Sequence, residues 1–204
     1  MRRVSSIEAK RIFDVVTALV VLGGLWPVFG AVAIAVRVDS HGPAMYRQER
    51  VGQHGRVFRI HKFRSMTVSS DSRLVSETGD ARITRVGRVL RRSKLDELPQ
   101  FIDVLLGSMS VVGPRPELPS YVALWEPERR DVILSVRPGI TDPASILLRH
   151  ESDELAAAAD PEQHYVQSLL PRKTALYVDY VQNRSLVGDL ALVFKTISTV
   201  LRDR

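Results

Sequence analysis

The sequence predicts a mainly α-helical fold with a small β-hairpin, and three observations lead to it. Residues 15–36 run about 22 residues without a charge, which is long enough to cross a bilayer as a helix. Residues 44–50 and 56–62 alternate loosely on either side of a glycine-containing turn, the pattern of a β-hairpin. Residues 98–106 and 186–201 carry apolar side chains at helical spacing, which indicates two amphipathic helices.

Length and composition narrow the class of protein. A chain of 204 residues forms one domain, or one domain with an appendage, and 45% apolar residues suffice for a core. The absence of cysteine excludes disulfides and thiolate metal sites and suits a reducing compartment. The net charge of +6 suits anionic lipid headgroups, phosphorylated substrates or nucleic acid.

The apolar segment at residues 15–36 has three interpretations. It is a signal peptide cleaved near Ala31, a single membrane-spanning helix, or a re-entrant helix that enters and leaves on the same side. Trp26 and Pro27 lie near its middle, where proline removes a backbone donor and kinks a helix. Lysine and arginine concentrate on the cytoplasmic side of membrane segments, and both flanks are basic. These cations are Arg2, Arg3, Lys10 and Arg11 before the segment, and Arg37, Arg47, Arg50, Arg56, Arg59, Lys62 and Arg64 after it. The charges favour a re-entrant helix broken at Trp26 and Pro27, and they leave the other two interpretations open.

The predicted hairpin is basic, and its role has two interpretations of equal weight. Lys62 and Arg64 either belong to a solvated surface or lie near a phosphate, since the sequence shows only their charge. Residues 67–82 are polar and are predicted to form a loop.

Residues 90–116 contain the densest group of chemically capable side chains. Arg91 precedes two adjacent carboxylates, Asp96 and Glu97, at a predicted helix start, where the helix dipole favours the ionised form. An ionised carboxylate can act as a covalent nucleophile or hold a divalent metal, and arginines can clamp phosphate. The alternative is an ordinary capping box from Ser93 to Asp96.

The rest of the chain is predicted to be helical with short breaks. Gly107 ends the helix of residues 98–106, and the rigid bend of residues 113–116 presents Arg115. A single helix is expected over residues 121–134. Further helices are expected after Asp160, over residues 173–183, and after a Ser185 cap. The apolar stripe of this last helix indicates packing in the core or on a membrane surface.

Several motifs in order resemble the bacterial sugar transferase family, the monotopic phosphoglycosyl transferases. They are Lys10-Arg11-Ile12-Phe13-Asp14, Lys62-Phe63-Arg64-Ser65-Met66, Leu95-Asp96-Glu97-Leu98-Pro99-Gln100, Val112-Gly113-Pro114-Arg115-Pro116 and Arg137-Pro138-Gly139-Ile140-Thr141. Family members usually continue the last motif with glycine, tryptophan and alanine, whereas this chain has Asp142-Pro143-Ala144. The similarity extends over nearly the whole chain, and a match of this length and order is specific.

The resemblance implies an architecture and an activity. Residues 1–39 would form an N-terminal basic segment and re-entrant membrane helix. Residues 40–204 would form a compact cytoplasmic catalytic domain on which interfacial amphipathic helices pack. The implied enzyme transfers a sugar-1-phosphate from a UDP-sugar to polyprenyl (undecaprenyl) phosphate and releases UMP. This is the first membrane step of assembling a glycan such as an exopolysaccharide, capsule, O-antigen or glycoprotein glycan. The implied location is the cytoplasmic face of the bacterial inner membrane.

The resemblance also implies roles for particular residues. Asp96 would carry a covalent phospho-sugar, with Glu97 as its partner, and both would bind Mg²⁺. Phosphate and nucleotide contacts would come from Arg91, Arg115 and Arg137, with Lys62 and Arg64. Two other classes of protein remain as alternatives to an enzyme. A non-catalytic membrane-anchored scaffold would need neither carboxylate. A nucleic-acid-binding protein would interleave aromatics with cations or carry a reading helix, and the sequence has neither pattern. A homodimer is compatible with the sequence.

Overall fold

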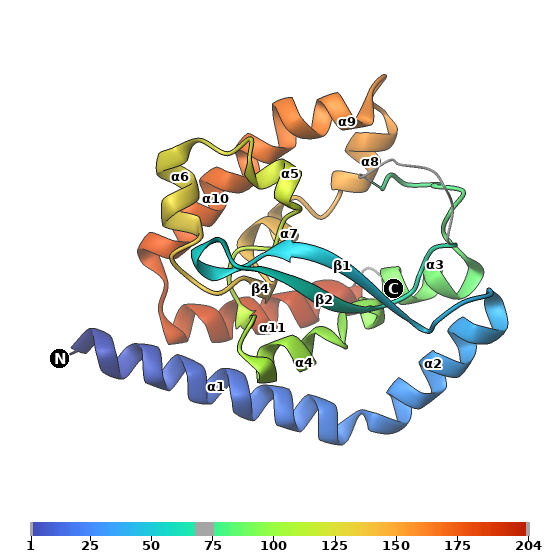
Figure 1. Cartoon of the computed structure of the whole chain (residues 1–204), viewed down its shortest axis with the longest axis horizontal. Helices are drawn as coiled ribbons and strands as arrows, with labels where there is room; N and C mark the ends of the chain where they lie inside the picture. The colour runs from blue at the N-terminus through green and yellow to red at the C-terminus, as the bar shows by residue number, and fades with distance from the viewer. Residues whose placement is uncertain (1, 68–75, 203–204) are drawn as a thin grey trace.

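The computed structural model describes residues 2–67 and 76–202, with side chains from Glu8 onward. In Figure 1 two joined helices run along one edge, a β-hairpin crosses the middle, and most of the short helices pack on the far side of the hairpin. The longer elements are α1 (Arg2–Gly24), α2 (Trp26–Asp39), β1 (Met45–Val51), β2 (Val57–Phe63), α3 (Arg85–Arg92), α10 (Leu170–Asn183) and α11 (Leu186–Arg202). The shorter elements are η1 (Gln53–Gly55), η2 (Leu95–Glu97), α4 (Gln100–Leu106), β3 (Ser110–Val112), α5 (Pro119–Val122), α6 (Pro127–Ile133), β4 (Gly139–Thr141), α7 (Pro143–Leu147), α8 (Glu151–Ala156), α9 (Pro161–His164) and η3 (Tyr165–Leu169).

The apolar N-terminal segment is broken, as its proline predicts. Helices α1 and α2 meet at Leu25 with a bend of 64°, and Pro27 lies in the first turn of α2. Within the described part of the chain, neither helix alone has the length and apolar character to cross a membrane. The bent pair meets that test in length and composition only.

Two arginines attach this bent pair to the rest of the protein. Arg11 on α1 donates to the carbonyl oxygens of Val104 and Leu105 at the end of α4, at 2.7 and 3.0 Å. Arg64, just past β2, is buried and donates to the carbonyls of His41 and Ser40, the latter at 2.7 Å. The bonds from Arg64 fix the chain just past the C-terminal end of α2.

The predicted hairpin is confirmed, and the structure adds a second pair of strands that the sequence did not indicate. Strands β1 and β2 pair antiparallel, with Met45 opposite Phe63 and Val51 opposite Val57. Strands β3 and β4 pair in parallel. The backbones next to this pair approach so closely that a Cβ added to Gly139 would lie 2.1 Å from the nitrogen of Gly113. Glycine at both positions therefore allows the 113–116 bend to lie against the chain before Asp142.

Most predicted helices are confirmed, and one is wrong. The predicted single helix over residues 121–134 is two short helices, α5 and α6, with Pro127 opening the second. Asp160 caps α9 by accepting from the nitrogen of Gln163, and Ser185 accepts from the nitrogen of Gly188 at the start of α11. Gly107 ends α4 with φ of 85°, which favours glycine.

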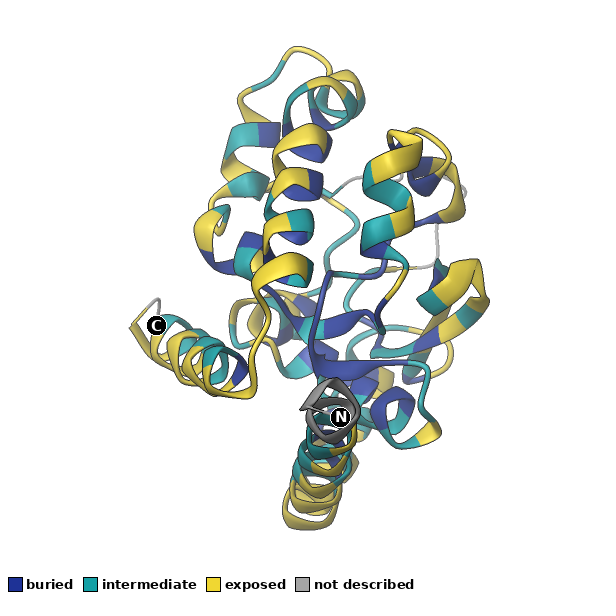
Figure 2. Cartoon of the chain, turned by 90° about the vertical axis from the view of Figure 1, so that its left-hand side faces the viewer, coloured by how far each residue is buried: buried dark blue, intermediate teal, exposed yellow. Residues whose placement is uncertain are grey.

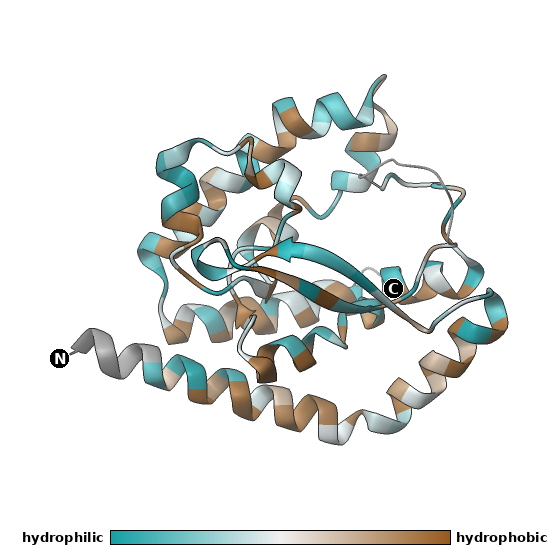
Figure 3. Ribbon diagram, in the orientation of Figure 1, coloured by the Kyte–Doolittle hydropathy of each residue, from teal (hydrophilic) through white to brown (hydrophobic). Residues whose placement is uncertain are grey.

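The buried apolar side chains of the described residues form three clusters, each of which includes a residue of the hairpin, and a large apolar surface remains outside them. Figure 2 shows buried strands at the centre and exposed residues along α1 and α11. Figure 3 shows that α1 and α2 carry many apolar residues on this outer side. Exposed apolar side chains include Ile12, Val16, Leu19, Val20, Trp26, Ile34, Val38, Leu106, Leu190, Phe194, Ile197 and Leu201. Most of the predicted α11 stripe therefore lies on the surface, although Val193 packs against the core.

Candidate active site

The two adjacent carboxylates lie in a short turn between α3 and α4. Lys94 has φ of 56° and turns the chain into η2, where Asp96 and Glu97 are 4% and 7% exposed. The hydroxyl of Ser93 donates to the carbonyl oxygens of Val89 and Leu90 in α3, so it ends one helix instead of starting the next. The alternative interpretation as a capping box is therefore wrong.

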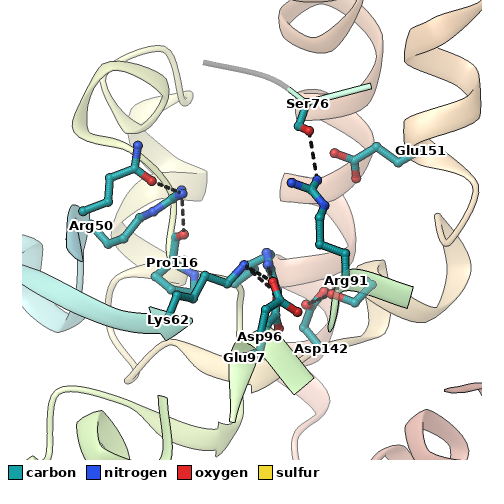
Figure 4. Close-up of polar contacts among 12 residues, drawn as sticks. Arg50, Lys62, Ser76, Arg91, Asp96, Glu97, Pro116, Asp142 and Glu151 are labelled. Carbon is teal, nitrogen blue, oxygen red and sulfur yellow. Dashed lines mark hydrogen bonds and ion pairs between the residues drawn. The ribbon is translucent and has the colours of Figure 1, made fainter. Parts of the chain in front are cut away.

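Cations from two other segments converge on this turn. In Figure 4 Lys62 reaches from β2 toward both carboxylates. Its Nζ lies 3.4 Å from Asp96 Oδ2 and 3.0 Å from Glu97 Oε1. Arg115 binds Glu97 with two nitrogens, Nη2 to Oε1 at 2.5 Å and Nη1 to Oε2 at 3.3 Å. Among the described residues, nothing hydrogen-bonds Asp96 Oδ1, although this atom is buried.

The two carboxylates therefore differ in availability. Burial alone would raise the pKa of Glu97, but the charges of Arg115, Lys62 and Lys94 outweigh it and hold that pKa well below its usual range. Glu97 in turn raises the pKa of Arg115 well above its ordinary value. Glu97 is thus an ionised anchor for two cations, while Asp96 has one oxygen left for a ligand or for reaction.

The carboxylates line a cleft of about 260 Å³ that also contains seven lysines and arginines. These cations are Arg50, Lys62, Arg91, Lys94, Arg115, Arg149 and Lys173, against four carboxylates, Asp96, Glu97, Glu117 and Glu151. Such an excess of cations suits a ligand with several negative charges. Arg91 reaches across the cleft from α3 to the hydroxyl of Ser76 at 2.9 Å (Figure 4).

The structure brings Lys62, Arg91, Asp96, Glu97 and Arg115 together, and it leaves two predicted residues elsewhere. Arg64 lies past the end of β2, where its guanidinium holds the carbonyls at the end of α2. Arg137 donates from Nε to the carbonyl of Gly107 at 2.9 Å and lines a separate cavity beside α1 and α11. Neither lines the cleft around Asp96.

Sequence reasoning missed one wall of the cleft. Glu117 accepts from the hydroxyl of Tyr165 at 2.9 Å and lies 3.8 Å from Arg50. Lys173 in α10 pairs with Glu151 at 2.8 Å. The position of Glu117 directly after the 113–116 bend could have indicated that it belongs to the site. Lys173 lies in a helical stretch, where nothing in the sequence indicates such a role.

The departure from the family pattern at residues 142–144 has a local structural explanation. Asp142 is fully buried and caps α7 by accepting from the nitrogen of Ser145 at 2.9 Å, with Pro143 in the first turn. Burial raises the pKa of Asp142, although its bond to Ser145 and the nearby Arg115 oppose this. The residues Asp142-Pro143-Ala144 therefore start helix α7 in this loop.

The donor set around Asp96 fits a magnesium ion that also binds phosphate. No cluster of three or more His, Asp or Glu side chains poised for a metal occurs in residues 8–67 and 76–202. Mg²⁺ is commonly held by one or two carboxylates together with substrate phosphates and water. Asp96 Oδ1 offers one such ligand, whereas both oxygens of Glu97 already bind cations.

Comparison with known proteins identifies relatives over almost the full chain. A sequence profile described as bacterial sugar transferase matches residues 5–203. An N-acetylgalactosaminephosphotransferase of Aeromonas hydrophila, which uses UDP-N-acetylgalactosamine and undecaprenyl phosphate, is 37% identical over 94% of this chain and 43% of its own length. The UDP-glucose:undecaprenyl-phosphate glucose-1-phosphate transferase of Escherichia coli K12 is 36% identical over 92% of this chain and 39% of its own length.

A third relative has a length closer to that of this chain. The exopolysaccharide production protein ExoY of Sinorhizobium fredii is 33% identical over 96% of this chain and 87% of its own length. The chain thus spans less than half of the first two relatives and most of the third. The profile match and these identities show that the chain belongs to the bacterial sugar transferase family.

Proposed function

We propose that the protein transfers a sugar-1-phosphate from a UDP-sugar to undecaprenyl phosphate and releases UMP, as the first membrane step of glycan assembly. One observation carries the proposal: a buried carboxylate, Asp96, keeps an unpaired oxygen in a cleft rich in cations. Related proteins are named for this reaction with glucose or N-acetylgalactosamine as the sugar.

In the proposed reaction Asp96 is the nucleophile. Its Oδ1 attacks the phosphorus that carries the sugar, and the bond from that phosphorus to the oxygen of UMP breaks. The sugar phosphate is then attached to Asp96 as an acyl phosphate. An oxygen of undecaprenyl phosphate attacks the same phosphorus, which releases Asp96 and forms the polyprenyl-diphosphate sugar.

The neighbouring residues have separate roles in this proposal. Lys62 holds Asp96 Oδ2 at 3.4 Å and so leaves Oδ1 as the reactive oxygen. Arg115 and Arg91 bind the diphosphate, because planar guanidinium groups match phosphate oxygens. Glu97 positions Arg115 and Lys62. Mg²⁺ held by the diphosphate would neutralise charge on the phosphates. Because Oδ1 of Asp96 is the attacking atom, Asp96 would bind the ion through Oδ2 only by releasing Lys62, and Glu97 would bind it only by releasing Arg115.

The proposed site of action is the cytoplasmic face of the bacterial inner membrane. The donor is soluble and the acceptor is a lipid, so the reaction requires an active site at the bilayer surface. The bent pair α1–α2 would enter the membrane and return, with the turn at Leu25, directly before Trp26 and Pro27. The exposed apolar side chains of α1, α2 and α11 support this contact with lipid.

UMP release from a panel of UDP-sugars tests the proposal. Purified protein should release UMP continuously with undecaprenyl phosphate, and about one equivalent without it. Mass spectrometry should then find one sugar phosphate on the peptide containing Asp96. Asp96→Asn should lose nearly all activity, whereas Asp131→Asn, at an exposed position, should keep it. A scaffold protein would release no UMP with any donor. UMP release only with lipid, and no labelled peptide, would indicate direct transfer and make Asp96 a metal ligand or base.

A further inference from the structure

Three residues on the walls of the cleft each have a buried polar side-chain atom with no hydrogen-bond partner among the described residues. Six buried side-chain atoms of the described residues are unpaired in this way, and those of Asp96, Arg50 and Tyr177 belong to residues that line the cleft. An unpaired buried polar group costs stability, so native proteins keep few of them. Three such unpaired groups in residues of one cleft indicate that a polar ligand forms the missing hydrogen bonds. Asp96 already has a proposed role, whereas the hydroxyl of Tyr177 has none.

Tyr177 differs from the other buried tyrosines. Tyr165 donates to Glu117 at 2.9 Å, and Tyr121 donates to Glu162 at 2.6 Å. Tyr180, one turn along α10 from Tyr177, donates to Asp189 at 2.8 Å and to the carbonyl of Val112 at 3.2 Å. Tyr177 is fully buried, and its hydroxyl bonds to none of the described residues.

The carboxylate whose charge acts most strongly on Tyr177, that of Asp142, already accepts hydrogen bonds. Both carboxylate oxygens of Asp142 accept from Ser145, one from its backbone nitrogen and the other from its hydroxyl. Burial, together with the charges of Asp142 and Glu117, raises the pKa of Tyr177 well above its ordinary value. The group therefore keeps its proton at physiological pH, and its electrostatic interaction with Arg115 indicates that the two lie close together. Both residues also line the cleft, so two residues with hydrogen-bond donors lie on the same part of its wall.

We propose that Tyr177 is a further donor-binding residue, whose hydroxyl donates a hydrogen bond to an oxygen of the diphosphate on the Arg115 side of the cleft. This inference rests on the proposed function, because it takes the diphosphate of a nucleotide sugar as the ligand. Nucleotide binding would supply the acceptor that the free protein lacks.

Two substitutions on the same helix test it. Tyr177→Phe removes only an unpaired hydroxyl, so the melting temperature of the free protein should stay the same or rise. Its affinity for UDP should fall about 10-fold or more, as expected when a hydrogen bond to a charged group is lost. The donor KM should rise, with the KM for undecaprenyl phosphate unchanged. Tyr180→Phe, which breaks two internal hydrogen bonds, should lower the melting temperature and leave UDP affinity unchanged.

The outcomes separate the two proposals. A lower melting temperature or loss of folded protein in Tyr177→Phe would show that its hydroxyl bonds within the protein, and would overturn the inference. Unchanged UDP affinity in a folded Tyr177→Phe protein would also overturn it. Wild-type protein that binds UDP but never releases UMP from UDP-sugars would refute the proposed function, while the UDP titrations would still decide the role of Tyr177.

Discussion

Replacing Glu97 by glutamine tests whether the carboxylate is the anchor of the site. The substitution keeps the size of the side chain and one carbonyl oxygen, but it removes the charge that pairs with Arg115 and Lys62. Arg115 and Lys62 would then remain beside Lys94 with less negative charge to balance them. We expect the folded protein to lose stability.

The structure sets the size of this loss. Removing one partner of a buried ion pair typically costs about 3–5 kcal/mol, because the other charge is left buried and unpaired. The side chains of Arg115 and Lys62 keep 29% and 25% exposure, so water can solvate them in part. We therefore expect a loss of about 2–3 kcal/mol, at or just below the lower end of that range. For a chain of this length the loss corresponds to a fall of about 5–10 °C in melting temperature.

Thermal unfolding of the detergent-solubilised protein is the assay, with Glu126→Gln as the matched control. Glu126 pairs with Arg129 at 2.9 Å but is 69% exposed, so its loss should change stability by about 0.5 kcal/mol or less. If Glu97→Gln changes the melting temperature as little as Glu126→Gln does, Glu97 is not the anchor that its contacts indicate.

Acid pH gives a second measurement of the same interaction. The folded state holds the pKa of Glu97 below the unfolded value of about 4.3. The stabilisation is therefore complete above about pH 4.3 and is lost as the pH falls through the folded-state pKa. The difference in stability between wild type and Glu97→Gln should narrow in that acid range. A difference that stays constant below pH 4 would contradict the assignment.

Three further predictions follow from the same contacts. Cysteines placed at Ser5 and Ser40 should be labelled from the same side of sealed vesicles. Pro27→Leu should straighten the helix, so that in some molecules the two cysteines are labelled from opposite sides. Arg64→Met should lower the melting temperature and leave the donor KM of the folded fraction unchanged, because Arg64 binds carbonyls and lies outside the cleft. A raised donor KM at normal stability would instead indicate that Arg64 contacts phosphate. Arg115→Lys keeps the charge but loses the planar fork, so it should raise the donor KM more than the acceptor KM, and equal changes in steady-state kinetics would count against a donor contact.

The sequence predicted the elements whose signals are local. Pro27 predicted the break between α1 and α2, and Asp160 and Ser185 predicted helix starts through capping. The split between α5 and α6 was missed, although Pro127 is a local signal at that point. The parallel pair β3–β4 could not be predicted in this way, because each strand has three residues and their pairing depends on distant backbones that meet at glycines.

The site shows the same division between local and distant information. The motif predicted Asp96 and Glu97, and the rigid bend predicted Arg115, because each lies in a distinctive short stretch. Lys62 and Arg64 were indistinguishable by charge, yet one reaches the carboxylates and the other turns to α2 where the strand ends. The direction in which each side chain points depends on which neighbour covers it, and a single sequence does not contain that information.

The attachment of both ends of the bent helix pair supports the proposed topology better than the count of flanking charges does. Several of the counted cations are bound within the protein: Lys10 pairs with Asp14 and Asp189, and Arg11 and Arg64 bind carbonyls. Their positions instead connect the part of α1 just before the apolar segment, and the end of α2, to one domain. A helix that crossed the membrane would separate those two ends by about 30 Å of hydrocarbon. With both ends held by the same domain, we propose that the pair meets the membrane from one side.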